Sequence, residues 1–231
     1  MNIRILQLLD GAKIATGLTV IIDVFRAFSV ECYLMQNGAS LLLPVGDKDD
    51  AYALKREMPN CVLIGERGGV KLPGFDFGNS PAEVEKVDFT GKTVVHTTSA
   101  GTQGIANAKN ADEIITGSLV NAGAIARYIK AGGYNDVSLV CMGLDGKKPT
   151  DEDTLCARYI EALLKGESID LELEIEKLKL TDGQKFFDPE LQHIFHERDF
   201  YLSVDADRFD FVLKLCKMPN GRDFIQKIDV I

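Results

Sequence analysis

The chain lacks the long apolar runs of a membrane protein. Its mean hydropathy is −0.01, and its first strongly apolar stretch, residues 18–22, is interrupted by Asp23. A membrane-spanning helix needs about 20 predominantly apolar residues, so no segment of this sequence qualifies. The pattern of a signal peptide, a basic segment followed by a long apolar one, is also missing from the N-terminus. The sequence therefore predicts a cytoplasmic protein without a membrane partner.

Paired cysteines are missing as well. The chain has five cysteines, an odd number, and no two of them form a C-x-x-C pair. Most of them lie among apolar residues, which is typical of buried, reduced thiols in a cytoplasmic protein. No cysteine is followed by a phosphate-binding loop that ends in arginine, and this absence argues against a cysteine phosphatase.

Positive charge is in short supply. The formal net charge is −9 at pH 7, which argues against nucleic acid and anionic membranes as partners. A small anionic phosphorylated substrate is still allowed, because a few local arginine and lysine residues can dominate a cleft. A homodimer is compatible with these features.

The residues that are present suffice for a hydrophobic core, since 45% of the 231 residues are hydrophobic. Apolar, β-branched runs alternate with helical patterns, which predicts an α/β fold with a largely parallel or mixed sheet flanked by helices. The predicted strands are 18–23, 41–45, 61–65, 93–96, 113–116 and 137–142. The predicted helices are 29–36, 47–58, 80–87, 102–109, 121–131 and 150–165.

The sequence predicts a single unit over residues 1–231. In an alternative arrangement, this unit has two lobes with a boundary near residue 90 and the site between them. Residues 171–176 alternate like a half-exposed strand or a charged helix, and both alternatives stay open. The tail from Phe186 onward is predicted to form short helices.

Polar side chains follow several of the predicted strands. Asp23 and Arg26 follow the first, Glu66 and Arg67 follow 61–65, and a hydroxyl-rich run follows 93–96. Asp145 and then three acids, at positions 151–153, follow the strand 137–142. Ligands of open α/β sheets bind outside the carboxyl ends of the strands, so these side chains are expected to share one site.

The run 97–102 and the acids 151–153 each allow two interpretations. Small residues and hydroxyls at the start of a helix can form an anion cradle, but a polar turn with a threonine cap has the same pattern. The run lacks the lysine of a Walker A loop. The acids at 151–153 could supply metal oxygens, or they could be favoured by the dipole of a capped helix.

Asp23 also allows two roles. After a buried strand it could bind a metal, with Arg26 holding a phosphate oxygen, or it could be a helix cap with a structural salt bridge. Phospho-aspartyl phosphatases have a second aspartate two positions later, where this chain has Phe25. A covalent aspartyl-phosphate route is therefore disfavoured.

The loop that follows Glu66 is rich in glycine and proline and carries Arg67 and Lys71. Loops of this length without regular structure are uncommon unless they are functional, so this loop could clamp an anion. The spacing of His193 and His196 resembles that of metal ligands, but we interpret this pair as surface residues. The role of His96 stays open.

At these segments the sequence resembles the 2-phosphosulfolactate phosphatase family, also called the ComB family. The resemblance rests on the stretches 23–27, 65–69, 74–81 and 97–102, and on Glu152-Asp153 followed by Cys156-Ala157. Their order and spacing agree with the family from about residue 18 to 160, and the tail from 205 to 219 agrees more loosely. Ala100 stands where many members of the family have asparagine, so an amide side chain is missing there.

The resemblance implies a Mg²⁺-dependent phosphatase acting on phosphosulfolactate, in coenzyme M synthesis, or on a related 2-hydroxy acid phosphate. The implied metal ligands are Asp23, Glu66, Glu152 and Asp153. The implied catalytic residues are Asp23, Arg26, Glu66 and Arg67. The implied substrate-binding residues are Lys71, Asn79, Ser80, Thr97, Thr98, Ser99, Gly101 and Thr102.

Two alternatives use the same residues. A sensor that binds a phosphorylated metabolite without turnover would need the anion cradle but no metal or base. A Mg²⁺-dependent isomerase or lyase acting on a phosphorylated acid would use the anion cradle together with the metal. A phosphate-release assay separates these alternatives from the phosphatase.

Overall fold

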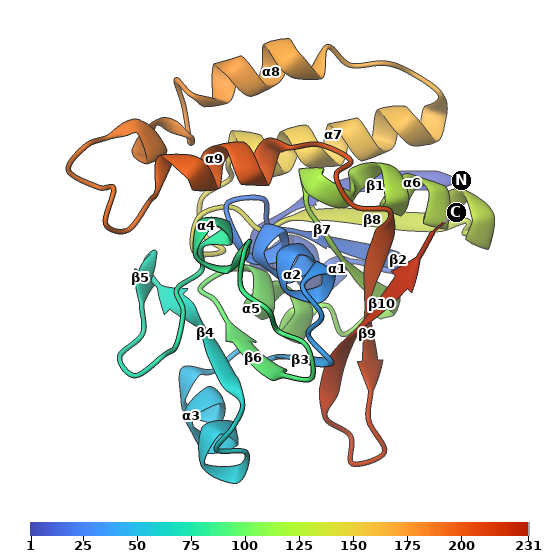
Figure 1. Ribbon diagram of the computed structural model, residues 1–231. Coiled ribbons are helices and arrows are strands. Elements are labelled where there is room, and N and C mark those ends of the chain that lie inside the picture. The colour runs from blue at the N-terminus through green and yellow to red at the C-terminus, as the bar shows by residue number, and fades with distance from the viewer. Residues whose placement is uncertain (231) are drawn as a thin grey trace.

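The computed structural model describes residues 1–230 and confirms the predicted α/β fold, with helices packed against a mixed ten-stranded sheet (Figure 1). The strands are β1 (Asn2–Gln7), β2 (Gly17–Ile22), β3 (Leu41–Pro44), β4 (Val62–Arg67), β5 (Val70–Lys71), β6 (Thr93–Thr97), β7 (Ala111–Gly117), β8 (Asp136–Cys141), β9 (Phe211–Lys217) and β10 (Asp223–Asp229). The order of strands across the sheet is β1-β8-β2-β7-β9-β10-β3-β6-β4-β5.

Helices form at all six predicted positions, and one further helix, α1, was not predicted. They are α1 (Leu8–Ile14), α2 (Ala27–Gln36), α3 (Lys48–Glu57), α4 (Pro81–Val84), α5 (Gly101–Asn107), α6 (Ala122–Gly132), α7 (Asp151–Lys165), α8 (Leu171–Leu178) and α9 (Glu197–Val204), with short 3₁₀ helices η1 (Leu119–Asn121) and η2 (Gln184–Phe187). Residues 171–176 belong to α8, so the charged helix is the correct one of the two alternatives.

Two parallel groups of strands make up most of the sheet. The first group is β1, β8, β2 and β7, and the second is β3, β6 and β4. The antiparallel hairpin β9–β10 lies between them and pairs with β7 on one side and with β3 on the other. The two parallel groups are therefore joined into one sheet only through this hairpin.

The prediction of short helices for the tail is wrong for this hairpin, although it holds for η2 and α9. The turn between β9 and β10 contains Asn220 and Gly221, and Gly221 has a φ of +84°. Asn-Gly between two apolar segments is a strong hairpin signal, because the turn requires positive φ. The sequence thus contained the information that the tail prediction missed.

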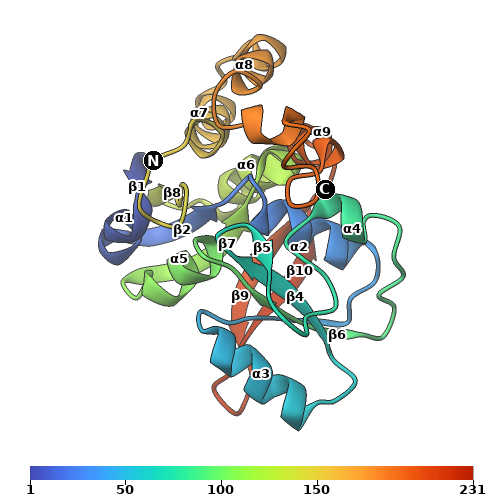
Figure 2. The ribbon, with the colours of Figure 1, turned by 90° about the vertical axis from the view of Figure 1, so that its left-hand side faces the viewer.

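The central strands are buried on both faces, as their continuous apolar runs predict. In β2, Leu18, Val20 and Ile22 pack with residues of α6 and α7, whereas Ile21 packs on the other face with residues of α1, α2 and α5. Figure 2 shows α7, α8 and α9 grouped at one end of the molecule and α3 at the opposite end. No helix among residues 1–230 is long and apolar enough to cross a membrane.

The strand order also determines where the strand ends meet. The second parallel group runs antiparallel to the first, because three antiparallel pairings separate them. In a flat sheet their carboxyl ends would lie at opposite edges. Sheets twist by about 20–25° per strand, and this twist accumulates across the hairpin. The carboxyl ends of β2, β4 and β6 consequently border one cavity.

Candidate active site

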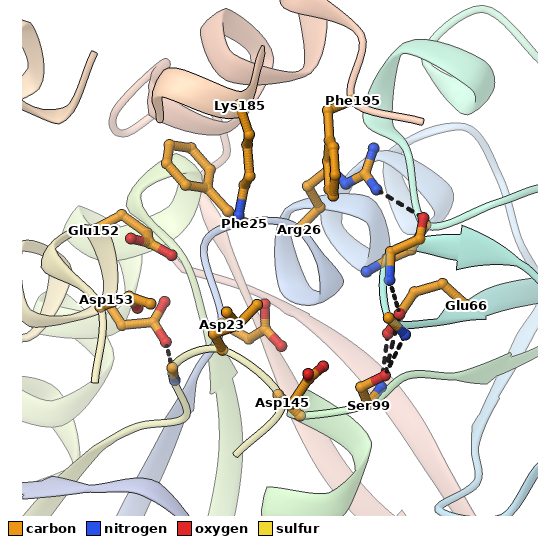
Figure 3. Close-up of a pocket in the computed structure, with 17 residues that line it drawn as sticks. Asp23, Phe25, Arg26, Glu66, Ser99, Asp145, Glu152, Asp153, Lys185 and Phe195 are labelled. Atoms are coloured by element: carbon orange, nitrogen blue, oxygen red, sulfur yellow. Dashed lines mark hydrogen bonds between the residues drawn. The ribbon is translucent and has the colours of Figure 1, made fainter. Parts of the chain in front are cut away.

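A cavity of about 250 Å³ lies where these strand ends meet (Figure 3). Its lining comes from segments that are far apart in the sequence. The lining residues are Asp23, Phe25, Arg26, Glu66, Gly68, Gly69, Asn79, Ser99, Ala100, Gly143, Leu144, Asp145, Thr150, Glu152, Asp153, Lys185 and Phe195. Residues after β2, β4 and β6 form a floor, and Lys185 and Phe195, from the tail, form a roof over it.

Asp23 occupies the centre of the floor, directly after β2. Its Oδ1 accepts a hydrogen bond from the backbone N–H of Ala27 at 3.2 Å, at the start of α2. Burial, with a smaller contribution from the nearby Glu66 carboxylate, raises the pKa of Asp23 to about 6. A Cβ at Gly101 would lie 2.9 Å from Asp23 Oδ2, so α5 can begin this close to the carboxylate only with glycine there.

Asp153 fastens two loops beneath the cavity. Its Oδ1 accepts from the backbone N–H of Val24, and its Oδ2 accepts from that of Gly143, each at 2.8 Å. Burial raises the pKa of Asp153 above its usual range, and the charges of Glu152 and Asp23 add to this shift. Asp153 therefore holds the loops after β2 and β8 in register while adding negative charge to the site.

Glu152, also in the first turn of α7, is a buried carboxylate whose hydrogen bonding is incomplete. Its side chain is 3% exposed, and its Oε2 has no hydrogen-bond partner among residues 1–230. Burial raises the pKa of Glu152 to about 7, although the charge of Lys185 lowers it. A buried carboxylate oxygen without a partner is costly, so a ligand of opposite charge would be strongly favoured there.

Glu66 lies on the other side of the floor, at the end of β4, and is fully engaged. Its Oε1 accepts from the backbone N–H of Ser99 at 2.7 Å. Its Oε2 accepts from the backbone N–H of Gly69 at 2.6 Å and from the hydroxyl of Ser99 at 3.1 Å. Glu66 thus ties the loop after β4 to the hydroxyl-rich loop after β6.

Arg26 borders the cavity but is held by a buried ion pair. Its Nη1 donates to Asp199 Oδ2 at 2.6 Å and to the carbonyl of Ile194 at 2.8 Å. The guanidinium also lies over the ring of Phe195, 4.9 Å from its centroid. Asp199 Oδ1 in turn accepts from the hydroxyl of Ser80 at 2.7 Å. This network attaches the tail to the loops of the site.

Several residues that were predicted to bind the substrate do not line the cavity. Arg67 donates to the carbonyls of Glu66 and Gly46 and to the hydroxyl of Thr97. Thr98 and Thr102 hydrogen-bond to each other at the start of α5, and Lys71 is exposed. These contacts are structural, and the substrate roles expected for Arg67, Lys71, Ser80, Thr97, Thr98, Gly101 and Thr102 stay predictions.

His96 belongs to a buried polar chain that ends at the cavity. Its Nδ1 lies 3.0 Å from Glu31 Oε1, and its Nε2 lies 3.4 Å from Oδ1 of Asn79, which lines the cavity. Glu31 Oε2 accepts from the hydroxyl of Thr116 at 3.4 Å. His96 therefore supports a residue of the wall and does not itself border the cavity.

Known proteins resemble this chain over most of its length. A family model described as 2-phosphosulpholactate phosphatase matches residues 3–216. A protein of Caldicellulosiruptor saccharolyticus named "Probable 2-phosphosulfolactate phosphatase" is 38% identical over 215 residues, which are 87% of this chain and 88% of that protein. A Bacillus subtilis protein of the same name is 33% identical over 219 residues, which are 93% of this chain and 94% of that protein.

The chain belongs to the 2-phosphosulfolactate phosphatase family. The resemblance seen in the motifs is therefore confirmed.

The donor set of this family member fits a hydrated divalent cation. No three Asp, Glu, His or Cys side chains within residues 1–230 converge closely enough to form a metal site by themselves. Mg²⁺ usually binds through one or two carboxylates and keeps several waters, so such a cluster is not required. A cation bound beside Glu152 would give its unpartnered Oε2 a partner.

The charge of the cavity points the same way. Within the described residues its lining contains five carboxylates and two cationic side chains. A phosphorylated acid would meet net repulsion there without an added positive charge. Glu152 and Asp23 are the residues best placed to hold that charge, because Glu66 and Asp153 already accept from backbone N–H groups with both oxygens.

Some lining residues escaped the sequence reasoning. Asp145 had been noted after the strand 137–142 but was given no role, and Lys185, Phe25 and Phe195 were not considered for the site. Lys185 and Phe195 lie in the polar tail, where no local motif distinguishes them from surface residues. The path of the tail, held by buried core residues such as Phe186 and by the Arg26–Asp199 ion pair, brings them to the cavity.

Proposed function

We propose that this protein is a Mg²⁺-dependent phosphatase that hydrolyses 2-phospho-3-sulfolactate, or a related 2-hydroxy acid phosphate, to the hydroxy acid and phosphate. Its membership of the family supports the reaction, and the names of its relatives support the substrate. The cytoplasmic location and a place in coenzyme M synthesis stay predictions.

One observation supports the metal dependence above all others. Glu152 is buried in the lining of the cavity with an unpartnered carboxylate oxygen, and Asp23, whose pKa is also raised, lines the same cavity. When bound, Mg²⁺ would neutralise phosphoryl oxygens and orient the ester, with Glu152 and Asp23 among its ligands.

The other lining residues would position the substrate. Lys185 brings positive charge from the roof of the cavity, above Asp23, whereas the charge of Arg26 is paired with Asp199. Ser99 presents a hydroxyl at the floor, next to the backbone of Gly68. Phe25 and Phe195 form apolar walls that reduce the access of bulk water and so strengthen these electrostatic contacts.

The test is a phosphate-release assay on purified protein with 2-phosphosulfolactate and other 2-phosphorylated hydroxy acids. We expect phosphate release only with a divalent metal and its loss on chelation. Undiminished turnover after thorough chelation would exclude the metal role. Binding without release would favour the sensor, and conversion without release of phosphate would favour the isomerase or lyase.

A matched pair of variants on α7 sharpens this test. Glu152→Gln removes the unpartnered carboxylate and is expected to weaken Mg²⁺ binding and lower the rate. Glu161→Gln removes a glutamate of the same helix that pairs with Lys165 away from the cavity. Equal metal requirements in the two variants would contradict the role of Glu152.

A further inference from the structure

The two cationic side chains that line the cavity differ in their engagement. The Arg26 guanidinium is paired with Asp199 and also donates to a backbone carbonyl. Lys185 has no carboxylate within 4.0 Å and no hydrogen-bond acceptor among residues 1–230. Of the two cationic side chains in the described lining, Lys185 is therefore the one without an ion pair or a hydrogen bond.

Aromatic rings hold the Lys185 ammonium in place. Its Nζ lies 5.8 Å from the ring centroid of Phe25, 5.4 Å from that of Phe186 and 5.3 Å from that of Phe195. Such rings attract a cation but accept few of its three hydrogen bonds. A half-buried ammonium in this setting still requires an oxygen-rich partner.

Lys185 and the carboxylates of the floor lie on different sides of the cavity. Lys185 belongs to η2 and descends from the roof, while Asp23, Glu66 and Ser99 follow strands at the floor (Figure 3). A phosphoryl group placed against Asp23 at the floor would direct the remainder of a three-carbon ester toward the roof. That remainder carries the substrate's other negative charges.

We propose that Lys185 binds the anion carried by the carbon chain of the substrate, its carboxylate or its sulfonate, while the phosphoryl group lies against the floor. This inference rests on the proposed phosphatase function. It makes Lys185 a specificity residue that distinguishes acid phosphates from phosphate esters of uncharged alcohols.

Other roles for Lys185 fit the structure less well. Neutralising Glu152 alone would call for an ion pair, and none forms within 4.0 Å among the described residues, although the two side chains line the same cavity. The basic residues predicted for the substrate are not available, because Arg67 is bound to backbone carbonyls and Lys71 is exposed.

Four esters that share one carbon skeleton test the proposal. They are 2-phosphosulfolactate, 2-phospholactate without the sulfonate, 1-sulfopropan-2-yl phosphate without the carboxylate, and propan-2-yl phosphate without either. We expect Lys185→Met to lower kcat/KM about 10- to 100-fold on the ester whose anion Lys185 binds, mainly through KM. The loss should be much smaller on the ester that lacks this anion.

The comparison among the two single-anion esters identifies the partner. A larger loss on 2-phospholactate assigns Lys185 to the carboxylate, and a larger loss on 1-sulfopropan-2-yl phosphate assigns it to the sulfonate. An equal loss on all four esters would overturn the proposal, because Lys185 would then bind the phosphoryl group. No loss on any of them would overturn it as well.

Two controls separate local from general effects. Lys177→Met removes a lysine of α8 that pairs with Glu174 away from the cavity, and should leave all four rates unchanged. Lys185→Arg keeps the charge and should retain part of the discrimination. Thermal melting of each variant shows whether the fold is intact.

Direct binding keeps the proposal testable if none of the esters is hydrolysed, an outcome that would contradict the proposed function instead. Calorimetry with 3-sulfolactate, lactate and 2-hydroxypropane-1-sulfonate measures the affinity for the carbon-borne anions without turnover. Lys185→Met should weaken the binding of 3-sulfolactate about tenfold or more. Unchanged affinity in this variant would refute the inference independently of any catalysis.

Discussion

Two glutamates line the same cavity and are almost equally buried, at 3% exposure for Glu152 and 5% for Glu66, yet their surroundings are opposite. Both oxygens of Glu66 accept hydrogen bonds, three in all, from Ser99 and Gly69. Glu152 has an oxygen without a partner, and burial raises its pKa to about 7. Burial alone therefore does not distinguish their roles.

The difference indicates that carboxylates of the same cavity have different roles. A carboxylate that is saturated by backbone N–H groups fixes loops and contributes to folding. A carboxylate that is left short of partners destabilises the fold until a cation arrives. Asp23 lies between these two cases, because its Oδ1 accepts from the backbone N–H of Ala27 while burial raises its pKa to about 6.

The largest effect is expected for Asp23→Asn, which removes the negative charge at the centre of the cavity floor. We expect kcat/KM to fall about 100-fold or more, with partial recovery at high Mg²⁺ if Asp23 is a ligand. Rates measured across a Mg²⁺ titration check this. Trapping a phosphorylated Asp23 by acid quench and mass spectrometry would instead reveal a covalent nucleophile.

The two glutamates themselves give the next prediction. Without added metal, Glu66→Gln should lower the free energy of unfolding by about 1–3 kcal/mol, because an amide cannot accept at both oxygen positions. Glu152→Gln should leave the free energy unchanged or raise it, by up to about 3 kcal/mol at pH 8. Denaturant unfolding of both variants measures this, and equal losses would falsify the division of roles.

The smallest effect is a pH dependence of stability. Asp23, Glu152 and Asp153 have raised pKa values, so the folded state binds protons more tightly than the unfolded chain. Their contribution is favourable at low pH, and it is lost for Asp23 as the pH rises through about 6 and for Glu152 as the pH rises through about 7. Acids with lowered pKa values, such as Glu113, lose their contribution only when the pH falls toward 4 and below.

In metal-free buffer, Tm should therefore increase when the pH is lowered from 8 to about 5.5. Glu152→Gln should flatten this slope. Mg²⁺ should raise the wild-type Tm more at pH 8 than at pH 5.5, because the carboxylates are then ionised. A wild-type Tm that rises with pH over this range would contradict the prediction.

The same contrast explains what the sequence could reveal. Asp23, Glu66 and Ser99 follow apolar strands directly, so the rule that ligands bind at strand ends finds them without a structure. The first turn of α7 was equally visible, because its acids follow directly on Thr150, the N-cap position of the helix. Which of these carboxylates is saturated depends on N–H groups of distant loops, and no local pattern encodes that.

The other residues of the site could not be predicted from the sequence, because they reach the cavity only through tertiary contacts. Lys185 approaches the floor because the tail is held there by the buried Phe186 and by the pairing of Asp199, on α9, with Arg26. The predicted clamp, Arg67, points instead into the gap between two loops and binds their carbonyls. A single sequence shows that a loop is charged, but not which of its cations faces the ligand.

The hairpin β9–β10 also has a consequence for the order of folding. As the chain leaves the ribosome, the strands of both parallel groups emerge before residues 211–229. Until the hairpin follows, β7 and β3 remain unpaired edges, and such edges invite association with other chains. Assembly of the cavity is thus a late, non-local event, and nascent chains that stop short of the hairpin should depend on chaperones even though they already carry every carboxylate of the site.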